Sequence, residues 1–314
     1  MSATQAQSRP HSGAINGTAI GALVLYLALW GSSVFYLYSK GGEEWMETVI
    51  IAAIFGLALP AVAWALTLGA KAPAIDVRRP AIETGAVLVY LALYTVLFLV
   101  FGLNWAHAVL PEGQGQDMLI MGMKLAVHVV LPVLLLIALR ARLAPMFQVR
   151  ANLQFWLTLV VMGAIILALL CFISPSLQNI EATHTPLTTL LWIGPLSYVW
   201  ITIEAGLCEE VLYRAVLQTR LTAFFNSPWA GVIATSILFA LAHAPGLYLR
   251  GGAETHGAAA DPIQVAAYTI AMLSPISLLF GLLYARTKSL LLVILLHGMV
   301  DVLPNMSEFI RTWL

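Results

Sequence analysis

The chain has 314 residues, of which 61% are hydrophobic and only 10% are charged, whereas a soluble domain has about 45–50% and about 25% of these classes. Fifteen basic and fifteen acidic residues leave no net charge, and no basic cluster could neutralise a run of phosphates, so we expect no nucleic-acid partner. The mean hydropathy of +0.90 requires a lipid bilayer as the solvent for so much apolar surface. The composition therefore predicts an integral membrane protein.

Apolar runs long enough to cross a membrane recur along the whole chain. A transmembrane helix needs about 20 residues, each rising about 1.5 Å, to cross about 30 Å of hydrocarbon. A transmembrane strand would alternate and would be about half as long, so these runs predict helices. We expect an all-α polytopic transmembrane bundle of eight or nine helices. The expected spans are residues 18–38, 47–68, 84–104, 118–139, 153–173, 188–219, 229–247, 263–285 and 289–303.

Three of these runs have features of their own. The first follows seventeen polar residues with a single basic residue, Arg9; this is too long and too weakly basic for a signal peptide, so residues 18–38 are expected to remain as a span. The sixth run, 188–219, is too long for one simple crossing and is expected to tilt or to project into the cytoplasm. The ninth run, 289–303, is short and is expected to lie partly buried in the bundle.

The basic residues of the short loops predict the orientation of the chain. Three basic clusters fall on one side if the helices cross in order, and the opposite loops carry acidic residues with Lys40 as their only clear base. The amino terminus is therefore expected in the cytoplasm. The three clusters are Lys71, Arg78 and Arg79; Arg140, Arg142 and Arg150; and Arg214 and Arg220.

The remaining stretches carry little functional signal. Cys171 and Cys208 both lie in apolar runs, where a small buried hydrophobe is expected rather than a disulfide. The Gly- and Ala-rich stretch 250–261 predicts a flexible outer loop. No internal repeat or long linker divides the chain, so we distinguish only N-terminal transmembrane helices of unassigned role (1–187) from a C-terminal core (188–314).

Ionisable side chains inside apolar helices are costly unless they face a polar interior, so they mark candidate functional sites. The first group is Glu209, Glu210 and Arg214 in the sixth run. Glu210 and Arg214 are four residues apart on one helix face and can form an ion pair. Glu209 is rotated by about 100° from Glu210, so its carboxylate need not share the arginine and suits a general base. The alternative interpretation is an ion-paired helix end that emerges into the cytoplasm.

Two histidine motifs follow in later runs. His243 lies four residues after Phe239, whose ring shares its face and could wall a site. A lone histidine on an apolar helix is also typical of a hydrogen-bonded interior residue. His297 lies four residues before Asp301, so the carboxylate can accept the ring N–H and fix the tautomer. A polar contact between helices is the alternative for this pair.

The depth of these residues in the membrane links the three motifs. Counted at about 1.5 Å per residue from the expected cytoplasmic helix ends, Glu209 lies about 16 Å deep, His243 about 22 Å and His297 about 13 Å. Allowing for helix tilt, the three side chains are expected to meet at one level. Together they predict one site rather than three separate contacts.

The ordered motifs resemble those of a known family. They are Glu209-Glu210-x-x-x-Arg214, Phe239-x-x-x-His243 and His297-x-x-x-Asp301, and they are similar to the three signature motifs of the CPBP family. This family comprises the CAAX-prenyl endopeptidases of the Ras-converting type and the Abi or bacteriocin-processing membrane proteases. The resemblance implies that residues 188–314 form a CPBP-like catalytic transmembrane core and that the protein is a glutamate-dependent intramembrane peptidase.

The resemblance also implies roles for the motif residues. Glu209 would activate the attacking water with His243, while His297 and Asp301 would stabilise the oxyanion. The supporting residues would be Glu210 and Arg214, which hold the first motif in place, and Phe239.

Asp301 departs from the family pattern, in which asparagine is common at this position. Asparagine can donate a hydrogen bond to an oxyanion, whereas an ionised aspartate only accepts. We therefore expect Asp301 to act indirectly, by keeping His297 protonated so that the imidazolium donates.

No cofactor is expected, although zinc is an alternative. A glutamate with two histidines supplies donors that zinc accepts, but the family is usually treated as metal-independent and the chain has no His-Glu-x-x-His helix. The expected partners are the lipid bilayer and a membrane-associated peptide or protein substrate. A bacterial cytoplasmic membrane is the expected location.

Two other functions stay open at this point. The first is a non-proteolytic scaffold, immunity protein or transporter that uses the same polar core; Lys124 and His128 in the fourth run would suit an ion path, or would line a peptidase cavity. The second is an enzyme acting on a lipid-linked substrate. Motifs of the serine, aspartyl and zinc classes of intramembrane protease, namely Gly-x-Ser-Gly, Gly-x-Gly-Asp and His-Glu-x-x-His, are absent from the sequence.

Overall fold

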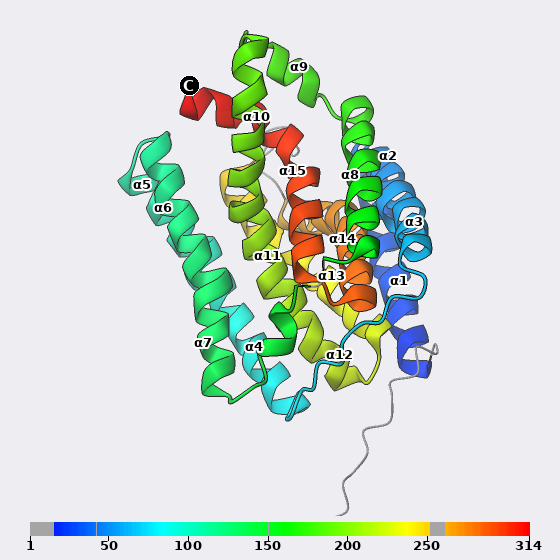
Figure 1. Ribbon diagram of the computed structural model, residues 1–314. Helices are drawn as coiled ribbons and strands as arrows, with labels where there is room; N and C mark the ends of the chain where they lie inside the picture. The colour runs from blue at the N-terminus through cyan, green and yellow to red at the C-terminus, as the bar shows by residue number, and fades with distance from the viewer. Residues whose placement is uncertain (1–15, 42, 150, 252–260) are drawn as a thin grey trace, which may run out of the picture.

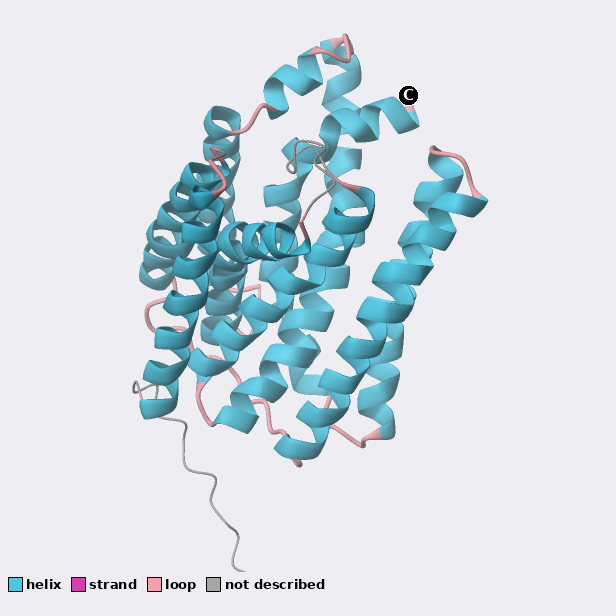
Figure 2. Cartoon of the chain, turned by 180° about the vertical axis from the view of Figure 1, so that it is seen from behind, coloured by secondary structure: helices cyan, strands magenta, loops and turns pink. Residues whose placement is uncertain are grey.

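A computed structural model describes residues 16–41, 43–149, 151–251 and 261–314. The described residues are 85% helical and contain helices and loops but no strand (Figure 2). Nine helices in these ranges are long and apolar enough to cross a membrane. The all-α polytopic bundle expected from the sequence is confirmed, and the protein is an integral membrane protein.

Five of the nine spans are uninterrupted α-helices and four contain π-helical turns. The uninterrupted spans are α1 (Gly17–Ser39), α8 (Leu153–Ile173), α13 (Pro228–Arg250), α14 (Pro262–Thr287) and α15 (Leu290–Trp313). The second span joins α2 (Glu44–Ile51), the π-helical η1 (Ala52–Ala58) and α3 (Leu59–Leu66); the third joins α4 (Pro80–Tyr94), η2 (Thr95–Gly102) and α5 (Leu103–Val109); the fourth joins α6 (Gln114–Leu125), η3 (Ala126–Val130) and α7 (Leu131–Ala138). The sixth joins α10 (Leu187–Ile201), η5 (Thr202–Leu207), α11 (Cys208–Glu210), η6 (Val211–Gln218) and α12 (Thr219–Phe225). Two short helices, the 3₁₀ turn η4 (Ala144–Phe147) and α9 (Ser176–Glu181), lie between spans.

Local capping residues determine where several spans begin. The side chain of Asn152 accepts a hydrogen bond from the Phe155 backbone N–H at 2.9 Å, and Ser289 caps α15 in the same way. Proline occupies the first turn of α13 and α14, where its missing N–H costs no hydrogen bond. These signals are local, so the expected spans agree with the structure to within a few residues at most ends.

The ninth span is the main exception. The sequence predicts an end at residue 303, but α15 continues through Pro304 to Trp313. Polar residues such as Asn305 and Glu308 end the apolar run, yet they remain helical and line a pocket. The prediction that this span is short is therefore wrong. The apolar run stops at the polar residues, although the helix itself continues.

The last two spans form the inner part of the bundle (Figure 1). About two thirds of the apolar window of α14 (67%) and more than half of that of α15 (56%) are buried, against 17% for α1. α14 packs along α13 and α1, while α15 packs against η5, α8 and α10. The expected burial of the ninth span is thus correct.

The two ends of the bundle differ in charge. α1 begins and α12 ends at one end, and the carboxyl terminus lies at the other (Figure 1). The Arg79 side chain bonds the Leu139 carbonyl oxygen and Arg142 pairs with Asp76 at 2.8 Å, so the basic loops before α4 and after α7 meet at the α12 end. These two expected basic clusters do share one face, whereas Arg150 lies outside the described residues.

The third expected basic cluster is not a loop cluster. Arg214 is fully buried, and Arg220 is 1% exposed, with its Nε 3.4 Å from the Glu83 carboxylate. A run of residues on one helix does not reveal whether its charged side chains reach water or turn into the bundle. The basic end of the bundle is therefore marked by the other two clusters alone.

Both cysteines are free, as expected. Cys208 is buried, but Cys171 is exposed on the outside of α8 beside Phe172, which is also exposed, so its predicted burial is wrong. Of the stretch 250–261, which was expected to be a flexible outer loop, residues 252–260 lie outside the described residues.

Candidate active site

The first motif lies where the sixth span departs from α-helical geometry. α11 holds only Cys208, Glu209 and Glu210 and is flanked by the π-helical η5 and η6. π-Helical turns are rare and are often found at functional sites, because they change the direction in which side chains point. The two glutamates therefore project from a widened part of the helix.

Glu210 and Arg214 form the ion pair expected from their spacing. Arg214 Nε lies 2.9 Å from Glu210 Oε2, and both side chains are fully buried. Arg214 Nη2 also donates to the Ser277 hydroxyl at 3.0 Å, which ties the sixth span to α14. The alternative of a helix end emerging into the cytoplasm is therefore wrong for this pair.

Glu210 has a second partner that the sequence did not reveal. Its Oε1 lies 2.8 Å from Nδ1 of His297, on α15. One buried carboxylate thus holds both the arginine of its own helix and the imidazole of another. Glu210 is a direct contact of the third motif and not only a support for the first.

Glu209 lies at the point where the three motifs meet. Its Oε2 is 3.9 Å from His243 Nε2 and 3.7 Å from His297 Nε2, and the side chain is 13% exposed. These separations are too long for direct hydrogen bonds. They suit a single water held among a carboxylate and two imidazoles, whose proximity the depth comparison predicts.

His243 is oriented by its own helix. Its Nδ1 lies 2.8 Å from the Phe239 carbonyl oxygen, and because a carbonyl only accepts, Nδ1 carries the hydrogen. The Nε2 of the neutral ring then presents a lone pair toward Glu209. The Phe239 ring lies 4.7 Å from the His243 ring and walls the site, as expected.

His297 is enclosed by acceptors. Its Nδ1 faces Glu210, and its Nε2 lies 3.1 Å from Asp301 Oδ2. The ring stacks on Phe280, with centroids 5.0 Å apart and planes 8° apart. Both ring nitrogens therefore face groups that only accept, so both contacts are hydrogen bonds when the ring is a doubly protonated imidazolium.

Two glycines allow α15 to approach the first motif. A Cβ added to Gly206 would lie 2.6 Å from the Ile294 carbonyl oxygen, and one added to Gly298 would overlap the Thr202 hydroxyl. Neither position accepts a larger residue unless the opposing atoms of Ile294 or Thr202 move. This close approach is what brings His297 within hydrogen-bond distance of Glu210.

Sequence reasoning missed Glu204. Its Oε1 lies 2.5 Å from Lys124 Nζ, so Lys124 is an ion-pair partner rather than a free cation. His128, the other residue noted in the fourth span, accepts at Nε2 from the Tyr94 hydroxyl at 2.8 Å. α-Helical spacing places Glu204 on a different face from Glu209, so the sequence did not indicate that Glu204 lies near the first motif.

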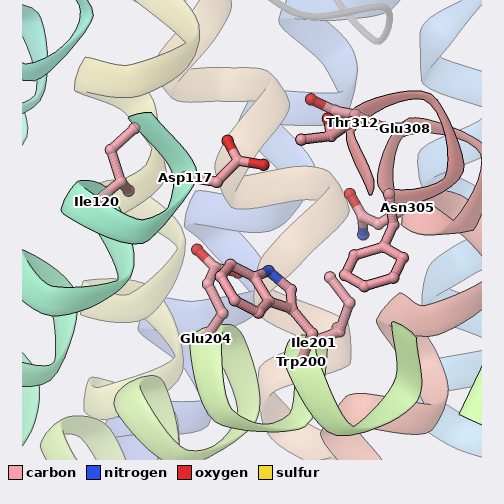
Figure 3. Close-up of a pocket in the computed structure, with 9 residues that line it drawn as sticks. Asp117, Ile120, Trp200, Ile201, Glu204, Asn305, Glu308 and Thr312 are labelled. Carbon is pink, nitrogen blue, oxygen red and sulfur yellow. The ribbon is translucent and has the colours of Figure 1, made fainter. Parts of the chain in front are cut away.

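A polar cavity of about 190 Å³ lies next to this cluster. Figure 3 shows Asp117 from α6, Glu204 and Trp200 from the sixth span, and Asn305 and Glu308 from α15 around it. Asn305 also donates to the Asp301 backbone carbonyl at 2.8 Å. The cavity thus borders the catalytic candidates through Glu204 and the turn of α15 that follows Asp301.

Within the described part of the chain, no three or more His, Cys, Asp or Glu side chains are arranged to hold a metal ion.

The membrane bundle, together with the motif-bearing segment, defines an intramembrane protease of the CPBP type. Residues 190–303 match the family model described as type II CAAX prenyl endopeptidase Rce1-like, so this part of the chain is similar to that family. The match confirms the resemblance inferred from the three motifs and indicates a hydrolase. No curated protein and no solved structure is significantly similar to the chain.

Proposed function

We propose that the protein is an endopeptidase that uses Glu209 to activate water and cleaves a membrane-associated peptide or protein. The observation that carries this proposal is the position of Glu209 Oε2, 3.9 Å from Nε2 of His243 and 3.7 Å from Nε2 of His297. A water bound there contacts Glu209, which is the base, and also His243 Nε2, which accepts a hydrogen bond from it. Residues 188–314 would then form the catalytic core.

The proposed reaction needs only groups of this chain. Glu209 takes a proton from the water, with His243 Nε2 accepting the second water hydrogen and orienting the oxygen. The hydroxide attacks the scissile carbonyl carbon, and the resulting oxyanion is stabilised by the imidazolium of His297, whose Nε2–H is shared between Asp301 and the oxyanion. The protonated Glu209 then gives its proton to the leaving amine as the C–N bond breaks.

The family description suggests the substrate class. The matching family is one of CAAX prenyl endopeptidases, so we propose a prenylated C-terminal peptide as the first substrate to test. Lipid modification would hold such a peptide at the depth of Glu209. We further propose the bacterial cytoplasmic membrane as the location, with the amino terminus in the cytoplasm on the basis of the two basic loop clusters.

The proposal is tested by comparing membrane peptides from cells that carry the wild-type chain with those from cells that carry Glu209→Gln. We expect at least one membrane peptide to accumulate uncleaved in the variant cells. Purified protein should cleave a farnesylated CAAX peptide and not its unprenylated counterpart. Identical peptide profiles in the two cell lines would contradict the proposal, and accumulation of a lipid would favour the lipid-linked alternative.

Asp301 is expected to act through His297. With Asp301 Oδ2 3.1 Å from Nε2, we expect Asp301→Ala to lower kcat by about 10- to 100-fold, because loss of the carboxylate removes the partner that favours the donating imidazolium. His297→Ala should be at least as damaging. Steady-state kinetics of both variants provide the measurement. If Asp301→Ala kept full activity while His297→Ala abolished it, the indirect role would be disproved.

Catalysis is proposed to be independent of metal. In the proposed geometry Asp301 and Glu210 occupy both nitrogens of His297, so metal ligation at this ring would have to displace a carboxylate. We expect cleavage to be unchanged after exhaustive dialysis against a chelator, with no stoichiometric metal in the purified protein by mass spectrometry. Loss of activity that added zinc restores would reverse this conclusion.

A further inference from the structure

Lys124 is the only lysine within the nine described spans. Its Nζ lies 2.5 Å from Glu204 Oε1, and the two side chains are 16% and 24% exposed. A charge in a membrane-spanning segment costs several kcal/mol unless it is paired or solvated. Lys124 therefore has a specific position inside the bundle, and the site already described does not account for it.

The π-helical turn brings its partner toward the catalytic glutamate. Five residues of α-helix turn the chain through about 500°, which would leave Glu204 about 140° away from Glu209. In η5 the backbone bonds run from residue i to residue i+5, so a step of five residues returns close to the same face. Glu204, whose Oε1 lies 2.5 Å from Lys124 Nζ, is therefore turned toward the face of the helix that carries Glu209.

Contacts within the N-terminal spans hold the lysine in place. The Lys124 carbonyl accepts from Nδ1 of His128 at 3.0 Å, and Nε2 of that ring accepts from the Tyr94 hydroxyl at 2.8 Å. The His128 ring also packs edge-on against Phe98, at 5.7 Å between centroids. The backbone that carries the ammonium group is thus anchored to the third span.

The charge balance of the site explains why such a cation matters. Four carboxylates face the cluster from two helices; Arg214 pairs with one of them, Glu210, and His297 lies between Glu210 and Asp301. As the tetrahedral intermediate forms, Glu209 takes up the water proton and its negative charge moves to the oxyanion, which is unfavourable in a partly buried site unless a cation lies close enough to offset it. The four carboxylates are Glu204, Glu209, Glu210 and Asp301.

We propose that the Lys124–Glu204 pair is a positioning element of this active site, in which the ammonium of Lys124 offsets the negative charge around Glu209 while the oxyanion forms. Glu204, which lines the polar cavity, holds the ammonium through its 2.5 Å contact with Nζ. The inference rests on the proposed peptidase function and assigns a catalytic contribution to the N-terminal spans. It also explains why the fourth span contains a lysine.

Kinetics of Lys124→Met provide the first test. We expect kcat to fall about 100-fold with KM changed less than about threefold, because the charge is needed when the oxyanion forms and not when substrate binds. Lys124→Arg should retain most of kcat, since it keeps the charge. Glu204→Gln added to Lys124→Met should restore part of kcat, because it removes the carboxylate left without a cation. A KM effect with unchanged kcat would overturn the proposal.

A matched ion pair on the same helix controls for stability. Arg220 and Glu83 also join the sixth span to an N-terminal span, with 3.4 Å between them and both 1% exposed, but they lie outside the site. Glu83→Gln should lower the melting temperature and leave kcat of the folded protein unchanged. If Glu83→Gln and Lys124→Met lowered kcat equally, the Lys124 effect would be a folding effect and the proposal would fail.

Binding of a tetrahedral anion separates this inference from the proposed function. A peptidyl phosphinate resembles the charged intermediate, whereas the peptide itself is neutral at the scissile bond. Lys124→Met should weaken phosphinate binding about 100-fold and peptide binding less than about threefold. Equal changes for the two ligands would overturn the inference whether or not the protein cleaves. Cleavage by Glu209→Gln would instead overturn the proposed function alone.

Discussion

Replacement of Glu209 by glutamine is expected to lower kcat by about 10³- to 10⁴-fold, which corresponds to about 4–5.5 kcal/mol of transition-state stabilisation. Glutamine has the shape of glutamate but cannot take a proton from water. Glu209 is 13% exposed and makes its two imidazole contacts at 3.7 and 3.9 Å, so its replacement breaks no direct hydrogen bond. The measurement is kcat on the farnesylated peptide, with thermal unfolding in detergent to verify the fold.

The same variant separates the peptidase from its alternatives. A scaffold, an immunity protein or a transporter would keep its phenotype in cells, because its polar core would still be present. Lys124 and His128, which suit an ion path, are engaged with Glu204 and Tyr94. A Glu209→Gln protein that folds and retains full cleavage would refute the role of this carboxylate as base.

Replacement of Glu210 by glutamine is expected to destabilise the fold by about 3–5 kcal/mol, because it leaves the charge of the buried Arg214 uncompensated. Glu210 is fully buried and accepts from both Arg214 and His297, at 2.9 and 2.8 Å. A glutamine amide cannot accept from both donors through two oxygens. Thermal or denaturant unfolding of the purified protein provides the measurement.

Two variants control for the cause of this destabilisation. Glu210→Met combined with Arg214→Met removes both charges at similar volume and should recover most of the stability but not the activity, since His297 loses its Nδ1 partner. Glu83→Gln should lower the free energy of unfolding by less than Glu210→Gln does, because Arg220 keeps its hydrogen bond to the Ala215 carbonyl oxygen at 2.9 Å. Wild-type stability of Glu210→Gln would show that Arg214 does not depend on this carboxylate.

Features that depend on near neighbours in the chain follow from the sequence. The spans are apolar runs, and their helical form follows because the hydrocarbon offers no partners to backbone N–H and C=O groups. The pairs Glu210–Arg214 and His297–Asp301 are each four residues apart, and both are within hydrogen-bond distance in the structure. Phe239 also lies four residues from His243, which places its ring beside the histidine.

Contacts between helices could not be predicted from the sequence. The bond from Glu210 to His297 depends on the rotation and depth of α15, which the close approach at Gly206 and Gly298 sets. Burial of Arg220 depends on Glu83 in a distant span. Hydropathy shows neither how a helix is rotated about its axis nor which residues its side chains contact. The sequence could therefore only place the motifs at similar depth.

The sequence by itself therefore determined the class of fold, most of the helix ends and the family motifs, because these depend on hydrophobicity and on the α-helical repeat. Only the tertiary structure decided that Glu204 pairs with Lys124 of the fourth span. The physical reason is the π-helical turn of residues 202–207, which changes the angular step between side chains. Two glutamates that α-helical spacing separates can thus face the same lysine.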